Sequence, residues 1–184
     1  MKNIGKVVGL YPTPVVIVGM YVDNRVNWIN IAHIGIIALD SVMLSIASNH
    51  FSNQGIKKYK SCSINILSAS EIENVDYVGI VSGEKIDKSQ VFPHDITEEL
   101  HVPIIKTAKV AMECKLTDIY ETPNHDNFIL EVVNTFVDEN VLNEKGKIDY
   151  LKVDPLMFEM PNRQYLSLGK VLGKCWNIGL KKEE

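Results

Sequence analysis

Short apolar runs rich in β-branched residues, separated by turn signals, dominate the pattern of this chain. Residues 15–21 form a continuous apolar run, and an Asp-Asn pair marks a turn before a second extended segment at residues 26–37. These two runs predict a hairpin. Residues 42–47 predict a third strand, and the apolar segment 63–67 predicts a fourth.

The clearest strand signal is an alternation with a period of two. Val110, Met112, Cys114 and Leu116 alternate with Ala111, Glu113, Lys115 and Thr117. This alternation turns one face inward and the other toward water. A tight turn at residues 124–127 then leads to residues 128–137, whose two faces are both largely apolar. Such a strand needs a second layer, which is a helix, the barrel interior or a partner subunit.

Two short helices complete the prediction. Residues 52–59 predict a helix that begins at Ser52 as its cap and turns Ile56 inward. Ser70 and Glu73 stand at the spacing of a capping box, and the apolar positions after them predict a helix that ends near Ser82-Gly83.

Many short strands with few helices predict a mainly β fold, either a barrel or a sandwich. Residues 84–102 and 138–163 predict long loops, and loops of this length usually carry function or bind another subunit. We expect residues 1–184 to form a single domain, because a chain of this length buries about 70% of its unfolded surface in one core.

Composition and charge exclude several classes of protein. A net charge of -4 argues against a nucleic-acid surface. No run approaches the ~18 apolar residues of a membrane helix, and the first residues lack the pattern of a secretory signal, so we expect a cytoplasmic protein with no membrane association. Three widely spaced cysteines and five histidines show no metal-ligand spacing, so we expect no metal.

Known catalytic motifs are also missing from the sequence. It contains no Gly-x-Ser-x-Gly elbow, no Gly-rich phosphate loop with Lys-Ser or Lys-Thr, and no Gly-x-Gly-x-x-Gly fingerprint. We therefore expect no catalytic side chain, and if the protein is an enzyme its chemistry belongs to a cofactor.

Amides, aromatics, hydroxyls and imidazoles gather on two neighbouring predicted strands and the loop that follows. The first strand carries Trp28, Ile29, Asn30, Ile31, Ala32 and His33, and the second opens into Ser48, Asn49, His50 and Ser52. Such a pair could hold a planar heteroaromatic ring along one strand and an anionic tail in the loop, which is the shape of flavin mononucleotide (FMN). Each residue also has a structural interpretation, such as a core indole or a surface histidine.

An ordered series of segments extends this pattern over about residues 9–173. It comprises residues 14–18, 27–35, 50–52, 65–66, 76–79, Ser82-Gly83 with Asp87-Lys88, 154–156, Tyr165, Leu168-Gly169 and Leu172-Gly173. The series resembles the flavin reductase-like, FMN-binding split-barrel family, near its flavoredoxin and NAD(P)H:FMN oxidoreductase branch. The chain departs from the family at Ser41-Val42, where a Pro-Pro pair is usual, and at His33, where a Trp is frequent.

The resemblance implies an FMN-binding split β-barrel that forms a homodimer. The flavin ring is expected along Trp28, Ile29, Asn30, Ile31, Ala32 and His33, and the phosphate near Ser48, Asn49, His50 and Ser52, with Ser82, Gly83 and Lys88 in the next segment. NADH or NADPH is the implied hydride donor, and the acceptor is a small molecule or a redox protein. Two alternatives stay open: a flavoredoxin-like electron carrier, and a non-enzymatic β-barrel that binds another ligand such as haem or serves in assembly.

His33 carries one further expectation. An imidazole changes charge near neutral pH, and a cation beside the ring would stabilise the anionic reduced flavin. On a two-residue alternation, however, His33 shares the side of Ile29 and Ile31 and could point into the core.

Overall fold

The computed structural model describes residues 1–179, and its architecture is mainly β with few helices, as the sequence predicts. Its centre is a seven-stranded antiparallel sheet in the order β3-β2-β6-β9-β10-β5-β4. The strands are β2 (Val16–Val22), β3 (Arg25–Ile31), β4 (Ile34–Ala38), β5 (Ser41–Ala47), β6 (Ser61–Ile66), β9 (Val110–Thr122) and β10 (His125–Val137). Only Ala32 and His33 join the two outermost strands, so the sheet curves round on itself with its seam between β3 and β4.

Smaller elements cover the barrel. The others are β1 (Thr13–Pro14), β7 (His94–Ile96), β8 (Pro103–Ile105), β11 (Met157–Glu159), β12 (Gln164–Leu166), α1 (Phe51–Tyr59), α2 (Ile72–Ile80), α3 (Tyr150–Val153) and the 3-10 turns η1 (Ala69–Glu71) and η2 (Glu139–Val141). Strands β1, β11 and β12 form one small sheet, and β7 pairs with β8. No helix among residues 1–179 is long and apolar enough to cross a membrane.

Two apolar clusters make up most of the core. The larger lies among the barrel strands and includes Leu44, Phe128 and Ile56, the inward residue of α1. The second surrounds Trp28 and joins β3 to α2 and to the segment around Phe92. Helix α2 therefore rests on the outside of β3, which places its exposed face beside the seam of the barrel.

The predicted strands are largely confirmed, and the main error concerns residues 26–37. This segment is two strands, because the chain leaves the ladder with β2 after Ile31 and joins β5 from Ile34. The predicted turn at residues 124–127 is shorter, since only Pro123 and Asn124 lie between β9 and β10.

Both predicted helix starts are wrong. Helix α1 begins after His50, and the Ser52 hydroxyl lies inside the helix, where it accepts a hydrogen bond from Asn27. Ser70 and Glu73 form no capping box, because Ser68 caps the preceding 3-10 turn instead. Helix α2 ends at Ile80, with Val81 as its C-cap residue, before the glycine that the sequence suggested as its terminus.

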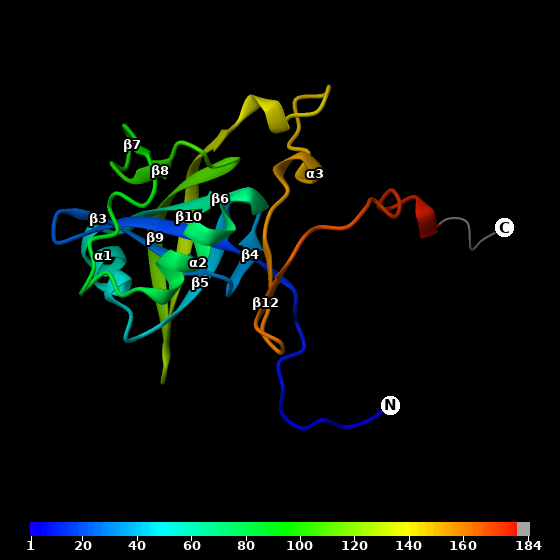
Figure 1. Cartoon of the computed structure of the whole chain (residues 1–184), viewed down its shortest axis with the longest axis horizontal. Helices are drawn as coiled ribbons and strands as arrows, with labels where there is room; N and C mark the ends of the chain where they lie inside the picture. The colour runs from blue at the N-terminus through cyan, green and yellow to red at the C-terminus, as the bar shows by residue number, and fades with distance from the viewer. Residues whose placement is uncertain (180–184) are drawn as a thin grey trace.

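The two terminal segments, residues 1–12 and 167–179, belong to none of the named helices and strands. Both run away from the barrel on the side where β4 lies (Figure 1). They carry exposed apolar side chains, among them Leu10, Leu172 and Trp176. Exposed apolar residues in this number usually mark a surface that packs on something else.

Candidate functional site

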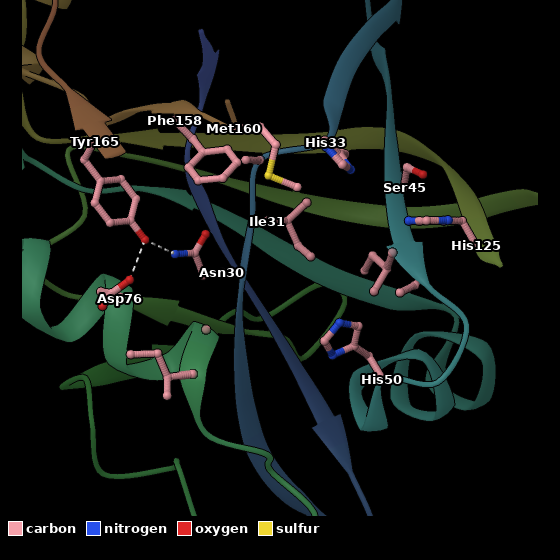
Figure 2. A pocket seen from close by; sticks show the side chains of 15 residues that line it. Asn30, Ile31, His33, Ser45, His50, Asp76, His125, Phe158, Met160 and Tyr165 are labelled. Carbon is pink, nitrogen blue, oxygen red and sulfur yellow. Dashed lines mark hydrogen bonds between the residues drawn. The ribbon is translucent and has the colours of Figure 1, made fainter. Parts of the chain in front are cut away.

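A pocket of about 400 Å³ opens beside the seam of the barrel (Figure 2). Its lining residues are Asn30, Ile31, Ala32, His33, Ser45, Ile46, Ala47, His50, Asp76, Gly79, Ile80, His125, Phe158, Met160 and Tyr165. The volume falls within the range of small-molecule sites, and the lining mixes apolar side chains with a few polar groups.

The seam explains why the pocket exists. Strand β3 ends at Ile31 and β4 begins at Ile34, so Ala32 and His33 belong to neither strand, although the His33 carbonyl still accepts a hydrogen bond from the Ser45 backbone N–H over 2.9 Å. His33 is consequently exposed and lines the pocket, so the alternation that would turn it toward the core does not extend to this residue. Its Nε2 lies 3.0 Å from the hydroxyl of Tyr11, which holds the ring at the rim.

Three imidazoles gather on one side of the pocket. His33 and His125 have ring centroids 6.4 Å apart, and His50 stands at the start of α1 (Figure 2). Burial lowers the pKa of His50 below its ordinary value, and the charges of Lys88 and His125 lower it further. The pocket therefore has one side lined by imidazoles, beside the point where β5 leads into α1.

The opposite side is a hydrogen-bonded group from three elements. The amide of Asn30 on β3 donates to the Tyr165 hydroxyl on β12 over 3.2 Å, and that hydroxyl donates to Asp76 on α2 over 2.7 Å (Figure 2). Burial raises the pKa of Tyr165 to about 12, and its hydrogen bond to Asp76 contributes to the rise. The phenol therefore keeps its proton at neutral pH.

Five of the thirteen residues that the sequence suggested line this pocket: Asn30, Ile31, Ala32, His33 and His50. The structure places others in the protein interior. Trp28 and Ile29 belong to the two core clusters. Ser52 is buried against Asn27, and a Cβ atom at Gly83 would clash with the Asn27 side chain.

The remaining four suggested residues lie near the pocket without lining it. Ser48 and Asn49 are exposed in the turn before α1, and Ser82 follows α2. Lys88 is buried, and its ammonium group donates to the carbonyls of Val78 and Val81 at 3.0 and 3.2 Å. Its charge influences His50 although its donors serve the end of α2.

The sequence analysis included residues 76–79 and Tyr165 in the series that resembles the family but assigned them no place in the site, and so it missed one wall of the pocket. Asp76, Gly79 and Ile80 lie on one face of α2 at the spacing i, i+3 and i+4, and this spacing was the available signal. Phe158, Met160 and Tyr165 come from the segment around β11 and β12, for which no periodicity predicted a strand. Among residues 1–179, no group of three or more His, Cys, Asp or Glu side chains is arranged to hold a metal ion.

Comparisons with known proteins agree on one family. Residues 8–167 match the model of the flavin reductase like domain. Flavoredoxin from Methanosarcina acetivorans is 29% identical, with a TM-score of 0.93 over 99% of this chain and 98% of that one. Flavoredoxin of Desulfovibrio vulgaris (Miyazaki F) is 32% identical, with a TM-score of 0.90 over 97% and 99%.

A third solved structure shares the fold at greater distance. An FMN-binding protein from Thermus thermophilus, with bound 1-cyclohex-2-enone, is 24% identical, with a TM-score of 0.80 over 95% of this chain and 98% of that one. No curated protein matches the sequence.

Proposed function

Because this chain belongs to the flavin reductase like family, we propose that it is an FMN-binding oxidoreductase that takes a hydride from NADH or NADPH and passes electrons to an acceptor. The observation that carries the proposal is the 400 Å³ pocket at the barrel seam, in a chain whose flavoredoxin relatives are 29% and 32% identical. Flavin supplies the redox chemistry when bound, and the protein binds and orients it.

The residues of the pocket fit a flavin. Apolar side chains such as Ile31 and Phe158 offer contact to a planar ring, and Asn30 offers a polar partner at its edge. Donor groups along residues 30–33 would serve the ring oxygens, in keeping with the sequence expectation for this segment.

The imidazole side of the pocket, beside the start of α1, fits a phosphate. Helix α1 is nine residues long and begins at Phe51, with His50 as its N-cap residue, and within the described chain it has no side-chain cap and no acidic residue in its first turn. Its N-terminal N–H groups and dipole favour an anion. His50 and His125 flank this end of the helix, with Ser48 and Asn49 in the preceding turn, so the phosphate is proposed to lie here.

The first test of the proposal is the visible spectrum of the purified protein, followed by titration with FMN. A yellow protein, or tight uptake of added FMN, is expected. A colourless protein that takes up no FMN would instead favour a non-enzymatic β-barrel.

An electron carrier is the second candidate, and a specific observation favours it: two solved structures that are 29% and 32% identical to this chain are flavoredoxins. Stopped-flow mixing of the FMN-loaded protein with NADH and with NADPH separates the two functions. Loss of flavin absorbance within minutes at millimolar nicotinamide supports a reductase, whereas persistent absorbance supports a carrier that another redox protein reduces.

We also propose that the protein is a homodimer. An apolar groove of about 740 Å³ runs along β4, β5 and β10, lined by residues that include Ile36, Leu39, Val132, Val133 and Tyr150. Val132 and Val133 belong to the strand whose two apolar faces predicted a further layer. Ile36 and Leu39 are 85% and 109% exposed, so a second copy is the proposed cover of this groove.

A further inference from the structure

One wall of the pocket is formed by three polar side chains, and each hydrogen bond between them has a defined donor and acceptor. Asn30 donates from Nδ2 to the carbonyl of Val75 over 3.1 Å and to the Tyr165 hydroxyl over 3.2 Å. Tyr165 in turn donates to Asp76 Oδ1 over 2.7 Å. Three elements, β3, α2 and β12, therefore meet at these side chains.

The direction of each bond follows from the chemistry of the groups. An ionised carboxylate such as Asp76 only accepts, so the single proton of the Tyr165 hydroxyl points to it. The raised pKa of Tyr165 keeps that proton in place at neutral pH. The phenol oxygen can then act toward Asn30 only as an acceptor.

Asn30 consequently has one possible orientation. Its two N–H donors face the Val75 carbonyl and the phenol oxygen of Tyr165, both of which accept. A flipped amide would place Oδ1 against two acceptors and would lose both bonds. Within residues 1–179 the Oδ1 atom has no hydrogen-bond partner, and it points away from Tyr165 and Asp76 (Figure 2).

Gly79 holds the amide in this position from the helix side. A Cβ atom at residue 79 would lie 3.2 Å from the Cβ of Asn30 and 3.4 Å from its Nδ2. The glycine thus lets α2 pack directly on Asn30, which leaves the side chain little room to rotate. The pocket therefore presents a fixed hydrogen-bond acceptor at this wall.

We propose that the Asn30 Oδ1 atom selects for an N–H donor, an imide or primary amide group, on the molecule held in the pocket. Asp76 and Tyr165 are then positioning residues that set the orientation of the Asn30 amide. The inference rests on the proposed function, which supplies two sources of this chemistry. One is the ring imide of the flavin, and the other is the carboxamide of the nicotinamide.

The test compares each natural ligand with an analogue that lacks the donor. Binding of FMN and of N3-methyl-FMN is measured by quenching of flavin fluorescence. The Michaelis constants for NADH and for its 3-acetylpyridine analogue, which replaces the carboxamide by a methyl ketone, are measured on the loaded protein. The wild type is expected to favour the natural member of one pair at least about tenfold, since a hydrogen bond to an uncharged donor contributes about 0.5–1.5 kcal/mol and an unpaired polar group adds a penalty.

Variants separate a hydrogen bond from a steric effect. Asn30→Leu keeps roughly the volume of the side chain and removes the acceptor. The preference for the natural ligand over its analogue, in whichever pair the wild type discriminates, is therefore expected to fall below about twofold. Tyr165→Phe keeps the aromatic ring and removes the hydroxyl that orients Asn30. It is expected to lower the preference for the natural ligand over its analogue at least about threefold. Tyr77→Phe, at an exposed tyrosine on α2 next to Asp76, is the matched control and leaves this preference unchanged.

Each outcome has a distinct meaning. Discrimination in the FMN pair that Asn30→Leu abolishes identifies the flavin imide, and the same result in the NADH pair identifies the carboxamide. Equal affinity of the wild type within both pairs, or discrimination that survives Asn30→Leu, overturns the role of Asn30 while leaving FMN binding intact. Failure to take up FMN at all overturns the proposed function, and the inference with it.

Discussion

At the scale of single residues, two glycines set how closely the helices approach the barrel. Gly55 lies in α1 where the helix crosses β2, and a Cβ atom there would clash with the carbonyl oxygen of Tyr21 and lie 2.7 Å from Cγ2 of Val22. Gly79 has the same role between α2 and Asn30. Neither has a left-handed backbone, so contact with the barrel is the reason for each glycine.

Gly55→Ala is expected to destabilise the protein although alanine is the better helix former. Helix propensity favours alanine by about 1 kcal/mol, but overpacking against a backbone carbonyl typically costs about 1–3 kcal/mol. The free energy of unfolding in urea measures the balance. Gly169→Ala, where no atom lies within 4 Å of the added Cβ, is the control. A Gly55→Ala protein more stable than the wild type would contradict the close contact.

His50→Ala is expected to weaken the binding of FMN at least about tenfold and the binding of riboflavin less than twofold. Riboflavin lacks the phosphate, and a hydrogen bond to a charged group contributes about 1.5–3 kcal/mol. Fluorescence titration of both ligands measures the two constants. Ser52→Ala, which removes a buried hydroxyl that accepts from Asn27, is expected to affect both ligands equally. Equal losses for His50→Ala would place the phosphate elsewhere.

Sequence reasoning found the residues that the barrel strands and the start of α1 contribute to the pocket, and it missed those from α2 and from the segment of β11 and β12 for a physical reason. Residue type alone marks Asn30, His33 and His50 as candidates, because amides and imidazoles beside buried strands need a partner. Asp76 and Tyr165 are 89 positions apart, and only the packing of α2 and β12 brings them together. Ser52 has the chemistry of a cap, but its burial against Asn27 gives it another role.

At the scale of elements, the hairpin of β9 and β10 anchors the loop between β7 and β8 through one buried carboxylate. Glu113 on β9 is 1% exposed and accepts hydrogen bonds from the Thr97 hydroxyl, the Leu100 backbone N–H and the Asn134 amide. The alternation at residues 110–117 placed Glu113 in water, but the loop from residues 84–102 covers that face. Strand alternation predicts which residues share a face and does not predict what covers it.

Glu113→Gln is expected to lower the free energy of unfolding at pH 7 by about 1–3 kcal/mol, because a neutral amide accepts less well and sets an N–H against Asn134. Burial alone would raise the pKa of Glu113, but the bonds from Asn134, Thr97 and Leu100 outweigh it, so the pKa is lowered. A lowered pKa gives stability that is present above the ordinary carboxyl range, near 4.3, and is lost as the pH falls through the folded value.

The free energies of unfolding of the wild type and of Glu113→Gln should therefore approach each other as the pH falls from 7 toward 3. Urea unfolding at several pH values measures both. Glu131→Gln, at an exposed position on β10, is the control and should show no such trend. A difference that is constant with pH would mean that the carboxylate contributes through its shape alone.

At the scale of the whole molecule, an apolar groove and two apolar terminal segments lie on the same side of the barrel. The apolar groove lies beside β4, and both terminal segments leave the barrel on that side with exposed apolar residues (Figure 1). Symmetric homodimers use one patch of each copy for both halves of the interface, so a single such side is sufficient. Composition and periodicity predicted the barrel, but the direction of the terminal segments depends on contacts that no short pattern encodes.

Sedimentation velocity is expected to give a mass of twice 20.7 kDa at micromolar concentration. Leu39→Asp places a charge in the apolar groove and should shift the mass toward that of one chain. Tyr120→Asp, at an exposed residue of β9 outside the groove, should leave the mass unchanged. A wild-type mass of 20.7 kDa would refute the dimer.

The two tryptophans of the chain lie at opposite extremes of exposure. Trp28 is 0% exposed and packs edge to face on Phe92 at 5.8 Å, whereas Trp176 is 99% exposed in the C-terminal segment. Ultraviolet emission from the native protein is thus the sum of a blue-shifted component from the core and a red-shifted one from the terminus. Acrylamide quenches only the red-shifted component. A single fluorescence experiment therefore reports two separate signals: the blue-shifted emission follows the folding of the barrel, and the quenching of the red-shifted emission follows whether the C-terminal segment is exposed or covered.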